Sequence, residues 1–487
     1  MQHYQLYIDG QWCEGSDGQR MQTINPANGQ AWADFACASA ADIDRAVAAA
    51  RSALDGEWGA LTPTARGKLI YRLAELIEQH AQALGDIETT DSGKLLSETR
   101  MQTGYVADYY RYYAGLADKI EGAVLPIDKP DMQVFTRPKP IGVVVAVVPW
   151  NAQMFLSATK LGPALAAGCT VILKASEVAP CTMFEFARLI EQAGFPKGVV
   201  QVVTGDAPNC AIPLTSHPDV DRIAFTGGPE TAKHVVRNSA ENFAVTTLEL
   251  GGKSPVLVFE DANLDSAVNG LIAGNFGASG QSCVAGSRGL VQRSIYAEVV
   301  ERIKARMVDM VVGDPHAAST HIGPLCTTAQ VAKARATIDA AKAQGAEVFQ
   351  IQQPLPSEHY LPPTLVTAEA HNVQTLEVEM FAPVMTLVPF EDEAEAIAMA
   401  NSTVYGLGSG IFTENLARAH RVSNRLRSGI CWINTYRAIS PISPFGGVNQ
   451  SGYGREAGQK AIEDYIRTQS VWINTSDQPM ANPFVMR

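Results

Sequence analysis

The chain has 487 residues, 46% of them apolar, so it can bury more than one hydrophobic core and we expect two or three domains. Its formal net charge of -12 argues against a nucleic-acid-binding or anionic-membrane surface, because both need concentrated positive charge. We therefore expect a small-molecule partner, with no nucleic acid and no membrane.

The sequence also lacks the signals of a membrane span, a secretory leader and the common metal sites. The longest apolar run, residues 141–150, is about half as long as a membrane-spanning helix. The first residues, MQHYQLYIDGQW, lack a basic segment followed by an apolar one, so we expect no secretory signal and a cytoplasmic location. The eight cysteines form no CxxC pair, which disfavours a disulfide framework and a thiolate zinc site. HExxH, Walker and GxSxG motifs are also missing from the sequence.

The first predicted elements are two amphipathic helices. Apolar residues recur at helical spacing over 42–54, after Asp42. A second helix begins at Thr62-Pro63, an N-cap followed by an N1 proline, and has a continuous apolar face through Ile77.

From residue 141, apolar runs rich in β-branched residues alternate with helical segments. The predicted strands are 143–148, 170–174, 199–203, 222–225 and 246–250, and predicted helices cover 182–193 and 229–240. Uninterrupted apolar strands are typical of sheets covered on both faces, and the intervals between them fit crossover helices. The pattern predicts a parallel α/β sheet.

A second α/β series follows from Pro255. It has a strand at 255–259, helices near 264–282 and 296–310, and a strand at 383–390. The proline-rich stretch 352–363 is predicted to be a loop. We expect a separate domain from about residue 252.

Cys283 lies in the run FGASGQSCVAGSR, among small residues such as Gly280 and Ser282 that leave room for a substrate to reach sulfur. A cysteine becomes a nucleophile when its thiolate is stabilised and its approach is open. Taken alone, this run fits a buried packing thiol better.

Two polar residues at predicted strand ends have the same ambiguity. Asn151, in VVPWNAQ, is an oxyanion donor or the start of an Asx turn. Glu249, in LELGGKSP, is a general base or half of a salt bridge between domains. The glycine-dense segment PFGGVNQSGYGREAG is either a functional loop or a tight surface connection.

These stretches together resemble the NAD(P)-dependent aldehyde dehydrogenase superfamily. FGASGQSCVAGSR, LELGGKSP, VVPWNAQ, VILKASEVAP, AFTGGPE, EVEMFAPV and PFGGVNQSGYGRE have the order and approximate spacing seen in that family. The resemblance begins with YIDGQW and INPANG and covers essentially the whole chain.

The resemblance implies catalytic roles for four residues. Cys283 would attack the aldehyde to give a thiohemiacetal, and the Asn151 amide and the Cys283 N–H would hold the oxyanion. Glu249 would activate the water that hydrolyses the thioester, which favours hydrolysis over transfer to coenzyme A. Lys160, beyond Asn151 in the same predicted helix, would belong to a proton relay, unless it is a solvated helix lysine. No metal is required.

The resemblance also implies NAD as the cofactor. Lys174 and Glu177 would contact the adenosine ribose, and a carboxylate at that position would repel a 2′-phosphate. NAD is therefore favoured, with NADP as a poorer substitute. The other implied cofactor residues are Trp150, Gly227, Gly228, Leu250, Glu379 and Phe381.

Four residues depart from the family pattern. Gly228 stands where serine is common, Ala232 where glycine is common at the helix start, and Ala382 replaces a usual glycine. Arg467 stands where some relatives carry a glutamate in a proton relay near the catalytic base. Because a cation cannot accept a proton, the relay here would use water or a different path.

The implied substrate entrance combines small and aromatic side chains. Ala152 and Thr159 are smaller than the aromatics often found there, which suggests a bulky or ring-bearing aldehyde. Arg437 would attract a distal anion unless it is simply solvated. The full predicted set is Ala152, Phe155, Leu156, Thr159, Phe276, Ser282, Val284, Arg437, Ile439 and Phe445.

The implied fold is a Rossmann-like cofactor domain (1–117 and 141–251), an α/β catalytic domain (252–467), and a small β oligomerisation element (118–140 and 468–487). Relatives with this element are homodimers or homotetramers. Two other functions stay open on the sequence: a cofactor-independent thiol esterase, and a catalytically silent structural relative. Intact Cys283, Glu249 and Asn151 argue against the second.

Overall fold

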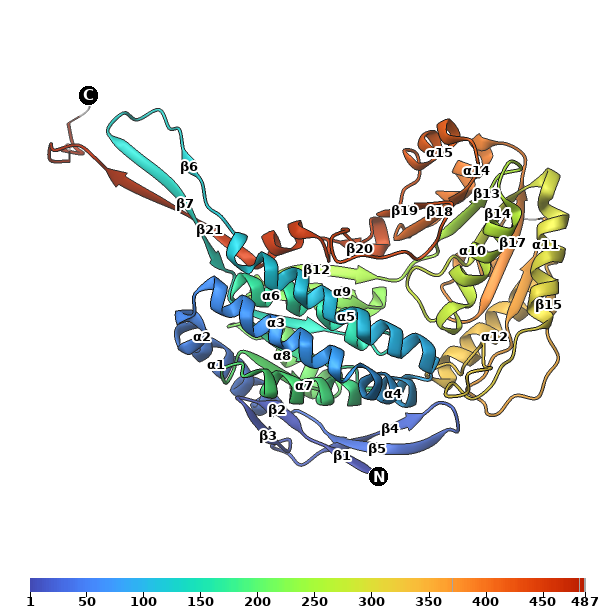
Figure 1. The fold of residues 1–487 in the computed structure, drawn as a ribbon, viewed down its shortest axis with the longest axis horizontal. Helices are drawn as coiled ribbons and strands as arrows, with labels where there is room; N and C mark the ends of the chain where they lie inside the picture. The colour runs from blue at the N-terminus through green and yellow to red at the C-terminus, as the bar shows by residue number, and fades with distance from the viewer. Residues whose placement is uncertain (370, 481, 486–487) are drawn as a thin grey trace.

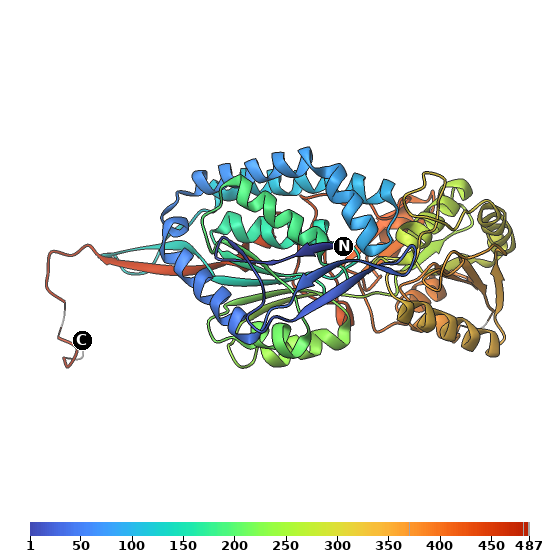
Figure 2. The same cartoon turned by 90° about the horizontal axis from the view of Figure 1, so that it is seen from below.

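The computed structural model describes residues 1–369, 371–480 and 482–485. Two large sheets lie side by side along the long axis of the molecule, and a narrow three-stranded arm projects from the end opposite the second sheet (Figures 1 and 2). Helices cover both large sheets. The predicted α/β class is confirmed.

The first large sheet has eight strands in the order β20-β12-β11-β8-β9-β10-β2-β3. Its five central strands β12, β11, β8, β9 and β10 are parallel and buried, as the uninterrupted apolar runs predict. The strands are β2 (Leu6–Ile8), β3 (Gln11–Cys13), β8 (Val143–Val147), β9 (Thr170–Lys174), β10 (Val200–Val203), β11 (Arg222–Gly227), β12 (Val245–Leu250) and β20 (Gly452–Tyr453).

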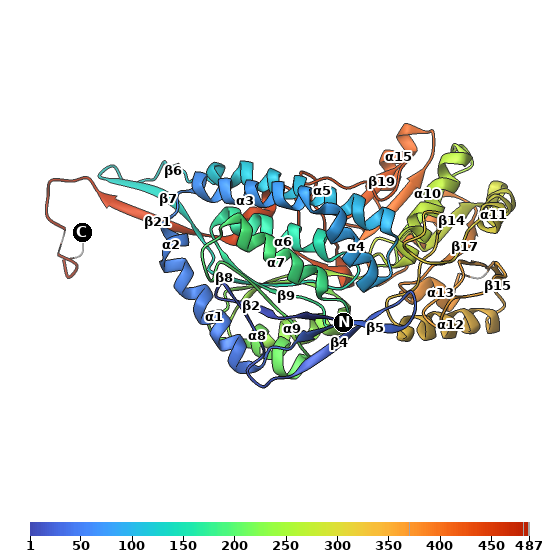
Figure 3. The same cartoon turned by 60° about the horizontal axis from the view of Figure 1, so that its bottom comes forward.

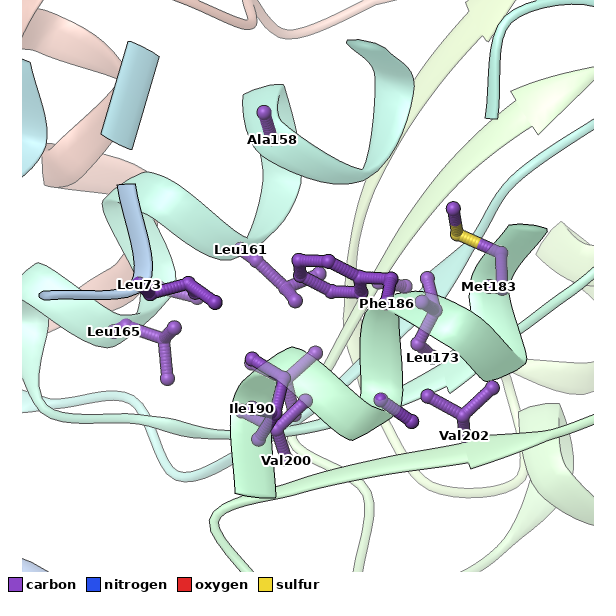
Figure 4. Packing of buried hydrophobic residues seen from close by; sticks show 14 of the residues in the cluster. Leu73, Ala158, Leu161, Leu165, Leu173, Met183, Phe186, Ile190, Val200 and Val202 are labelled. Carbon is purple, nitrogen blue, oxygen red and sulfur yellow. The ribbon is translucent and has the colours of Figure 1, made fainter. Parts of the chain in front are cut away.

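Helices pack on both faces of this sheet (Figure 3). On one face, Leu73, Leu161, Phe186 and Ile190 pack against Val202 and its neighbours on the strands (Figure 4). This face carries α3 (Pro63–Gln79), α4 (Ala81–Ser92), α5 (Leu96–Leu116), α6 (Gln153–Ala167) and α7 (Cys181–Ala193). The opposite face carries α1 (Ala40–Asp55), α8 (Ile212–Ser216) and α9 (Pro229–Asn238).

The helix starts follow the predicted local signals. Thr62 accepts a hydrogen bond from the Ala65 N–H at the start of α3, with Pro63 in the first turn. Ser39 and Asp42 form a capping box at the start of α1. The short helix α2 (Glu57–Ala60) connects these two elements.

The second large sheet has seven strands in the order β15-β16-β17-β14-β13-β18-β19. Its strands are β13 (Pro255–Val258), β14 (Arg288–Gln292), β15 (Glu347–Gln350), β16 (Thr364–Thr367), β17 (Val384–Phe390), β18 (Gly408–Phe412) and β19 (Ile430–Ile433). The associated helices are α10 (Leu264–Phe276), α11 (Arg293–Val308), α12 (Thr328–Ala343), α13 (Gln374–Glu377), α14 (Glu393–Ala400) and α15 (Leu416–Ser423).

One helix prediction in this part of the chain is too long. The helix expected over 264–282 ends at Phe276, because Gly277 has an extended backbone with ψ of 141°, and Ala278 and Ser279 then adopt left-handed conformations with φ of 54° and 52°. A short 3-10 turn (Gly277–Gly280) follows, so Cys283 lies on a loop. The predicted loop over 352–363 carries no helix or strand.

Two small sheets complete the fold. The N-terminal one, of order β1-β5-β4, contains β1 (Gln2–Tyr4), β4 (Arg20–Asn25) and β5 (Gln30–Ala36). The other, which we call the arm, contains β6 (Val124–Leu125), β7 (Met132–Pro140) and β21 (Ile466–Asn474), in the order β21-β7-β6. Of the predicted segment 468–487, residues 481, 486 and 487 lie outside the described residues. Within the described parts of the chain, no helix is long and apolar enough to cross a bilayer.

The register of the first sheet brings several predicted site residues to one edge. Val147 pairs with Lys174, and Thr226 pairs with Glu249, so β8, β9, β11 and β12 end close together. The carboxyl edge of an open parallel sheet is where such folds bind ligands.

Candidate active site

A cleft runs along the carboxyl edge of the eight-stranded sheet toward the seven-stranded sheet. It has an outer and an inner part, which share Pro149, Trp150, Thr226, Gly227 and Gly228. The outer part contains Lys174 and Glu177. The predicted residues that line the inner part are Asn151, Leu156, Glu249, Leu250, Cys283, Glu379 and Phe381. The structure therefore brings the predicted catalytic and cofactor residues together, with Lys160 buried beside Thr226.

The loop that carries Cys283 is fixed by buried hydrogen bonds. The Ser279 hydroxyl accepts from the Gly323 N–H at 2.9 Å, and the Gln281 side chain accepts from the Cys326 N–H at 2.9 Å. Gly280 has a φ of +74°, and a Cβ there would lie 2.1 Å from the Ala382 carbonyl oxygen. Only glycine meets both constraints, so this residue sets the path of the loop.

Asn151 lies beside this loop. It precedes the first residue of α6 and is not in the helix of Lys160, contrary to the prediction. Its Nδ2 donates to the Gln281 carbonyl oxygen at 3.0 Å, two residues before Cys283. The amide is therefore positioned against the Cys283 loop, as an oxyanion donor must be.

The surroundings of Cys283 favour the neutral thiol. Desolvation raises the pKa of Cys283 to about 12, and the carboxyl groups of Glu379 and Glu249 act in the same direction. The Arg437 guanidinium and the Cys283 backbone N–H lower this pKa. A thiolate forms here only when a proton acceptor or additional positive charge is close.

The raised thiol pKa has a measurable consequence in the protein without ligands. Alkylation of Cys283 by iodoacetamide should become about tenfold faster per pH unit between about pH 7 and 9, because the thiolate fraction grows at that rate below the pKa. Mass spectrometry of the Cys283 peptide gives the rate. A small thiol of ordinary pKa in the same buffers should level off near about pH 9. If Cys283 levels off with it, its pKa is not raised.

Glu249 is buried at the end of β12, with 3% of its surface exposed. Neither carboxyl oxygen has a hydrogen-bond partner among the described residues. Desolvation raises the pKa of Glu249 well above its ordinary value, and the charge of Glu456 adds to this effect, while Lys160 and Arg455 oppose it. A buried carboxyl group without partners is unusual in a purely structural role, and a raised pKa suits a general base.

Lys160 is held by a partner that the sequence analysis did not identify. Its Nζ donates to the Thr226 hydroxyl at 2.6 Å and forms an ion pair with Glu456, and both charged side chains are buried. The Thr159 hydroxyl donates to the other oxygen of Glu456 at 2.6 Å. Lys160 is therefore not a solvated lysine. Glu456 belongs to the quoted segment PFGGVNQSGYGREAG, so a carboxylate in that glycine-dense loop was the available signal.

Arg467 lies outside this network, so it takes no part in the contacts around Glu249. It is exposed on β21 and forms an ion pair with Asp221, which precedes the first residue of β11. Glu249 lies at the opposite, carboxyl end of the neighbouring strand. The carboxylate near Glu249 is Glu456.

The cofactor residues form two groups. In the outer part, Lys174 donates to Glu177 at 2.5 Å. In the inner part, Glu379 accepts from the Gly252 N–H at 2.9 Å, and the Trp150 and Phe381 rings meet edge to face. Desolvation raises the pKa of Glu379. The start of α12 adds three cleft residues that sequence patterns did not indicate, because only the fold brings them there: Thr327, Gln330 and Lys333.

The backbone around Gly228, Ala232 and Ala382 accepts these three departures from the family pattern. Gly228 is the N-cap of α9, and the space where a Cβ would point is open. Ala232 is buried in the first turns of that helix and donates its N–H to the Gly228 carbonyl oxygen at 3.0 Å. Ala382 is also buried, so the backbone there accepts a Cβ.

The predicted entrance residues lie in different environments. Phe276 and Val284 are buried in the core beside the seven-stranded sheet, and the Thr159 hydroxyl donates its hydrogen bond to Glu456. Leu156 lines the inner cleft. Ser282 lines a small hollow with Gly280 and Phe381. The partly exposed set that remains is Ala152, Phe155, Arg437, Ile439 and Phe445.

Helix α5 contributes aromatic residues to the same region that the sequence analysis missed. Tyr109 packs edge to face on Phe155, with ring centroids 5.1 Å apart. The Tyr105 hydroxyl donates to the Ile439 carbonyl oxygen at 3.1 Å. Both tyrosines lie in the helical segment before residue 117 and carry no motif of their own.

Comparisons with known proteins identify the family of this chain. A model of the aldehyde dehydrogenase family matches residues 12–471. The chain is 52% identical, over the full length of both proteins, to a (Z)-2-((N-methylformamido)methylene)-5-hydroxybutyrolactone dehydrogenase of Acinetobacter baylyi.

Solved structures give the same result. An NAD+ complex of an aldehyde dehydrogenase from Bacillus cereus is 38% identical, with a TM-score of 0.95 over 98% of this chain and 97% of that one. A betaine aldehyde dehydrogenase from Staphylococcus aureus in complex with NAD+ is 35% identical, with a TM-score of 0.96 over 99% and 96% of the two chains. The chain belongs to the aldehyde dehydrogenase family.

Proposed function

We propose that this protein oxidises an aldehyde to a carboxylic acid with NAD, using Cys283 as the nucleophile and Glu249 as the base. The observation that carries the proposal is that both side chains line one cleft, which continues to the Lys174–Glu177 pair. Family membership supports aldehyde oxidation and gives no support to the esterase or structural alternatives.

In the first half of the reaction, the Cys283 sulfur bonds to the aldehyde carbon, the thiol proton passes to water, and the carbonyl oxygen becomes an oxyanion. The Asn151 amide and the Cys283 N–H stabilise the oxyanion, because both donors lie at the nucleophile. The resulting thiohemiacetal then loses a hydride and becomes a thioester. NAD, when bound, supplies the hydride acceptor.

The cleft fits that cofactor. Glu177 is suited to accept hydrogen bonds from ribose hydroxyls and to disfavour a 2′-phosphate, which supports NAD over NADP. The open N-cap at Gly228 leaves the start of α9 free to meet a pyrophosphate. Glu379 and Phe381 line the inner end beside Cys283, where the nicotinamide half must lie. The relatives crystallised with NAD+ support the same choice.

In the second half, Glu249 takes a proton from water, whose oxygen attacks the thioester carbon and displaces the Cys283 thiolate. The Lys160–Glu456 pair lies close enough to act on the pKa of Glu249. Thr226 and Thr159 hold the two members of that pair. We propose that this pair passes the proton away from Glu249.

We propose a bulky or ring-bearing substrate. The Acinetobacter baylyi relative is named for a substituted 5-hydroxybutyrolactone. Such a ring is the cyclic form of a 4-oxo carboxylic acid, in which the aldehyde carbon carries the ring oxygen. The small side chain of Ala152, with Phe155 and Ile439 nearby, is compatible with a ring-sized group.

The test is oxidation of aliphatic, aromatic and carboxylate-bearing aldehydes with NAD and with NADP, followed by cofactor absorbance. We expect acid and NADH in equal amounts, with NAD preferred. If no aldehyde in the panel yields NADH, or if the acid forms without cofactor, the proposal fails.

We also propose that the protein is a homodimer or homotetramer in the cytoplasm. The arm leaves Val124 and Trp472 exposed at 70% and 56%, on a sheet with free edges. All eight cysteines are free thiols, as in a reducing compartment. Sedimentation of the purified protein distinguishes a monomer from either assembly.

A further inference from the structure

Arg437 is the one charged residue of the predicted entrance, and within the described chain a single hydrogen bond holds its side chain. It lies in the loop after β19, is partly buried, and has a φ of +64°, an uncommon conformation for arginine. Its Nη1 donates to the Ala273 carbonyl oxygen at 3.1 Å, in the last turn of α10. Among the described residues this is its single hydrogen bond, and it forms no ion pair. Donors on the other guanidinium nitrogens stay available.

Gly277 provides the space for this guanidinium. Its φ of -56° and ψ of 141° suit any residue, so backbone conformation does not require glycine there. A Cβ at this position would lie 2.2 Å from Arg437 Nη1. The glycine is therefore explained by the arginine, and the two form a matched pair between the Cys283 loop and the entrance.

The acidic side chain next to Gly277 does not form an ion pair with Arg437. Glu98 is close to Gly277, but one of its oxygens accepts the Ala278 N–H at 2.7 Å, and it makes no ion pair with Arg437. Glu98 therefore stabilises the loop through the Ala278 N–H. At the Cys283 sulfur, the carboxyl groups of Glu379 and Glu249 raise the pKa of the thiol. The Arg437 guanidinium lowers that pKa.

The remaining entrance side chains are apolar or aromatic. Phe155 packs against Tyr109, Ile439 is 36% exposed, and Phe445 is partly buried between the two large sheets' cores. A cation with available donors beside apolar walls is suited to an organic anion, because a carboxylate accepts two parallel N–H bonds from one guanidinium.

We propose that Arg437 binds a carboxylate on the aldehyde substrate, so that the enzyme prefers oxo acids over neutral aldehydes. This inference rests on the proposed function, since it concerns the substrate of the same reaction. The competing explanation is that Arg437 only closes the last turn of α10 through the Ala273 carbonyl, as basic side chains do at helix C-termini.

The experiment compares ω-oxo carboxylates of increasing length with their methyl esters. For the best oxo acid, Arg437→Met should lower kcat/KM about 10- to 150-fold, the range for a lost hydrogen bond to a charged group, mainly through KM. The methyl ester should lose much less, because both substrates share any effect of Arg437 on the pKa of Cys283 but only the oxo acid has the carboxylate. Arg437→Lys should retain part of the preference. Arg72→Met, at an exposed position on α3, is the matched control and should behave as wild type.

Gly277→Ala provides a second variant that keeps the arginine. Its new Cβ must displace Nη1, so the KM for the oxo acid should rise while the KM for the ester stays near the wild-type value. Thermal unfolding of each variant checks that the fold is intact. If acid and ester lose activity equally, or if the wild type prefers the ester, the role of Arg437 as an anion site is overturned.

A binding measurement separates this inference from the proposed function. Calorimetry with succinate, a dicarboxylate that resembles a product, should show binding to the wild type and a clear loss with Arg437→Met. If no aldehyde is oxidised but succinate binding still depends on Arg437, the proposed function fails and the anion site stands. If aldehydes are oxidised but succinate binds both proteins equally, the anion site fails alone.

Discussion

Changing Cys283 to alanine should abolish acid formation, with a loss of more than about a thousandfold in kcat, because the enzyme loses the atom that bonds to the aldehyde. No other cysteine lines the cleft among the described residues. NAD binding should survive, since the outer contacts at Lys174 and Glu177 are untouched. Steady-state NADH production and NAD calorimetry measure the two effects.

The matched control is Cys431→Ala, which removes an exposed thiol on β19. It should leave both turnover and NAD binding at wild-type levels. If the Cys283→Ala protein still oxidises aldehydes at a substantial fraction of the wild-type rate, the covalent route is wrong. If it loses NAD binding as well, the substitution has disturbed the cleft, and Cys283→Ser becomes the informative variant.

Changing Glu249 to glutamine should separate the two halves of the reaction. Thioester formation does not require this carboxylate, so a first burst of about one NADH per active site should persist. Steady turnover should fall by about 10²- to 10⁴-fold, the usual contribution of a general base. Rapid mixing followed by the steady-state rate gives both quantities from one trace.

Glu241→Gln, at an exposed position before β12, is the corresponding control and should retain both phases. In the Glu249→Gln protein, the acyl group should stay on Cys283 long enough to appear as added mass on the intact chain. Equal loss of the burst and of turnover would show that Glu249 serves the first half of the reaction and not hydrolysis of the thioester.

The elements of the fold were largely predictable because their signals are local. The strand prediction 170–174 matches β9 in every residue, since an uninterrupted apolar run suits a sheet buried on both faces. The start of α3 follows from Thr62 and Pro63. The end of α10 was missed although Gly277, directly after the helix, was an available signal, and the left-handed conformations of Ala278 and Ser279 carry no sequence signal of their own.

In the site, too, residues in short motifs were predictable, and contacts between distant segments were not. Cys283, Asn151 and Glu249 came from short motifs, and the structure brings them to one cleft. The partner of Lys160 was not identified from the sequence, because Glu456 lies 296 residues away in the chain and meets Lys160 only after both segments have folded. The residues at the start of α12 were missed for the same reason.

By itself, the sequence determined the α/β class and the family resemblance, because these depend on periodicity and on motifs of residues close together in the chain. Through the resemblance it also predicted Cys283, Asn151 and Glu249 as site residues. Only the tertiary structure decided that Lys160 pairs with Glu456, that Arg467 pairs with Asp221, and that Gly277 makes room for Arg437. Those pairings depend on how distant loops meet at the ends of two sheets, and nothing local to either partner specifies such contacts.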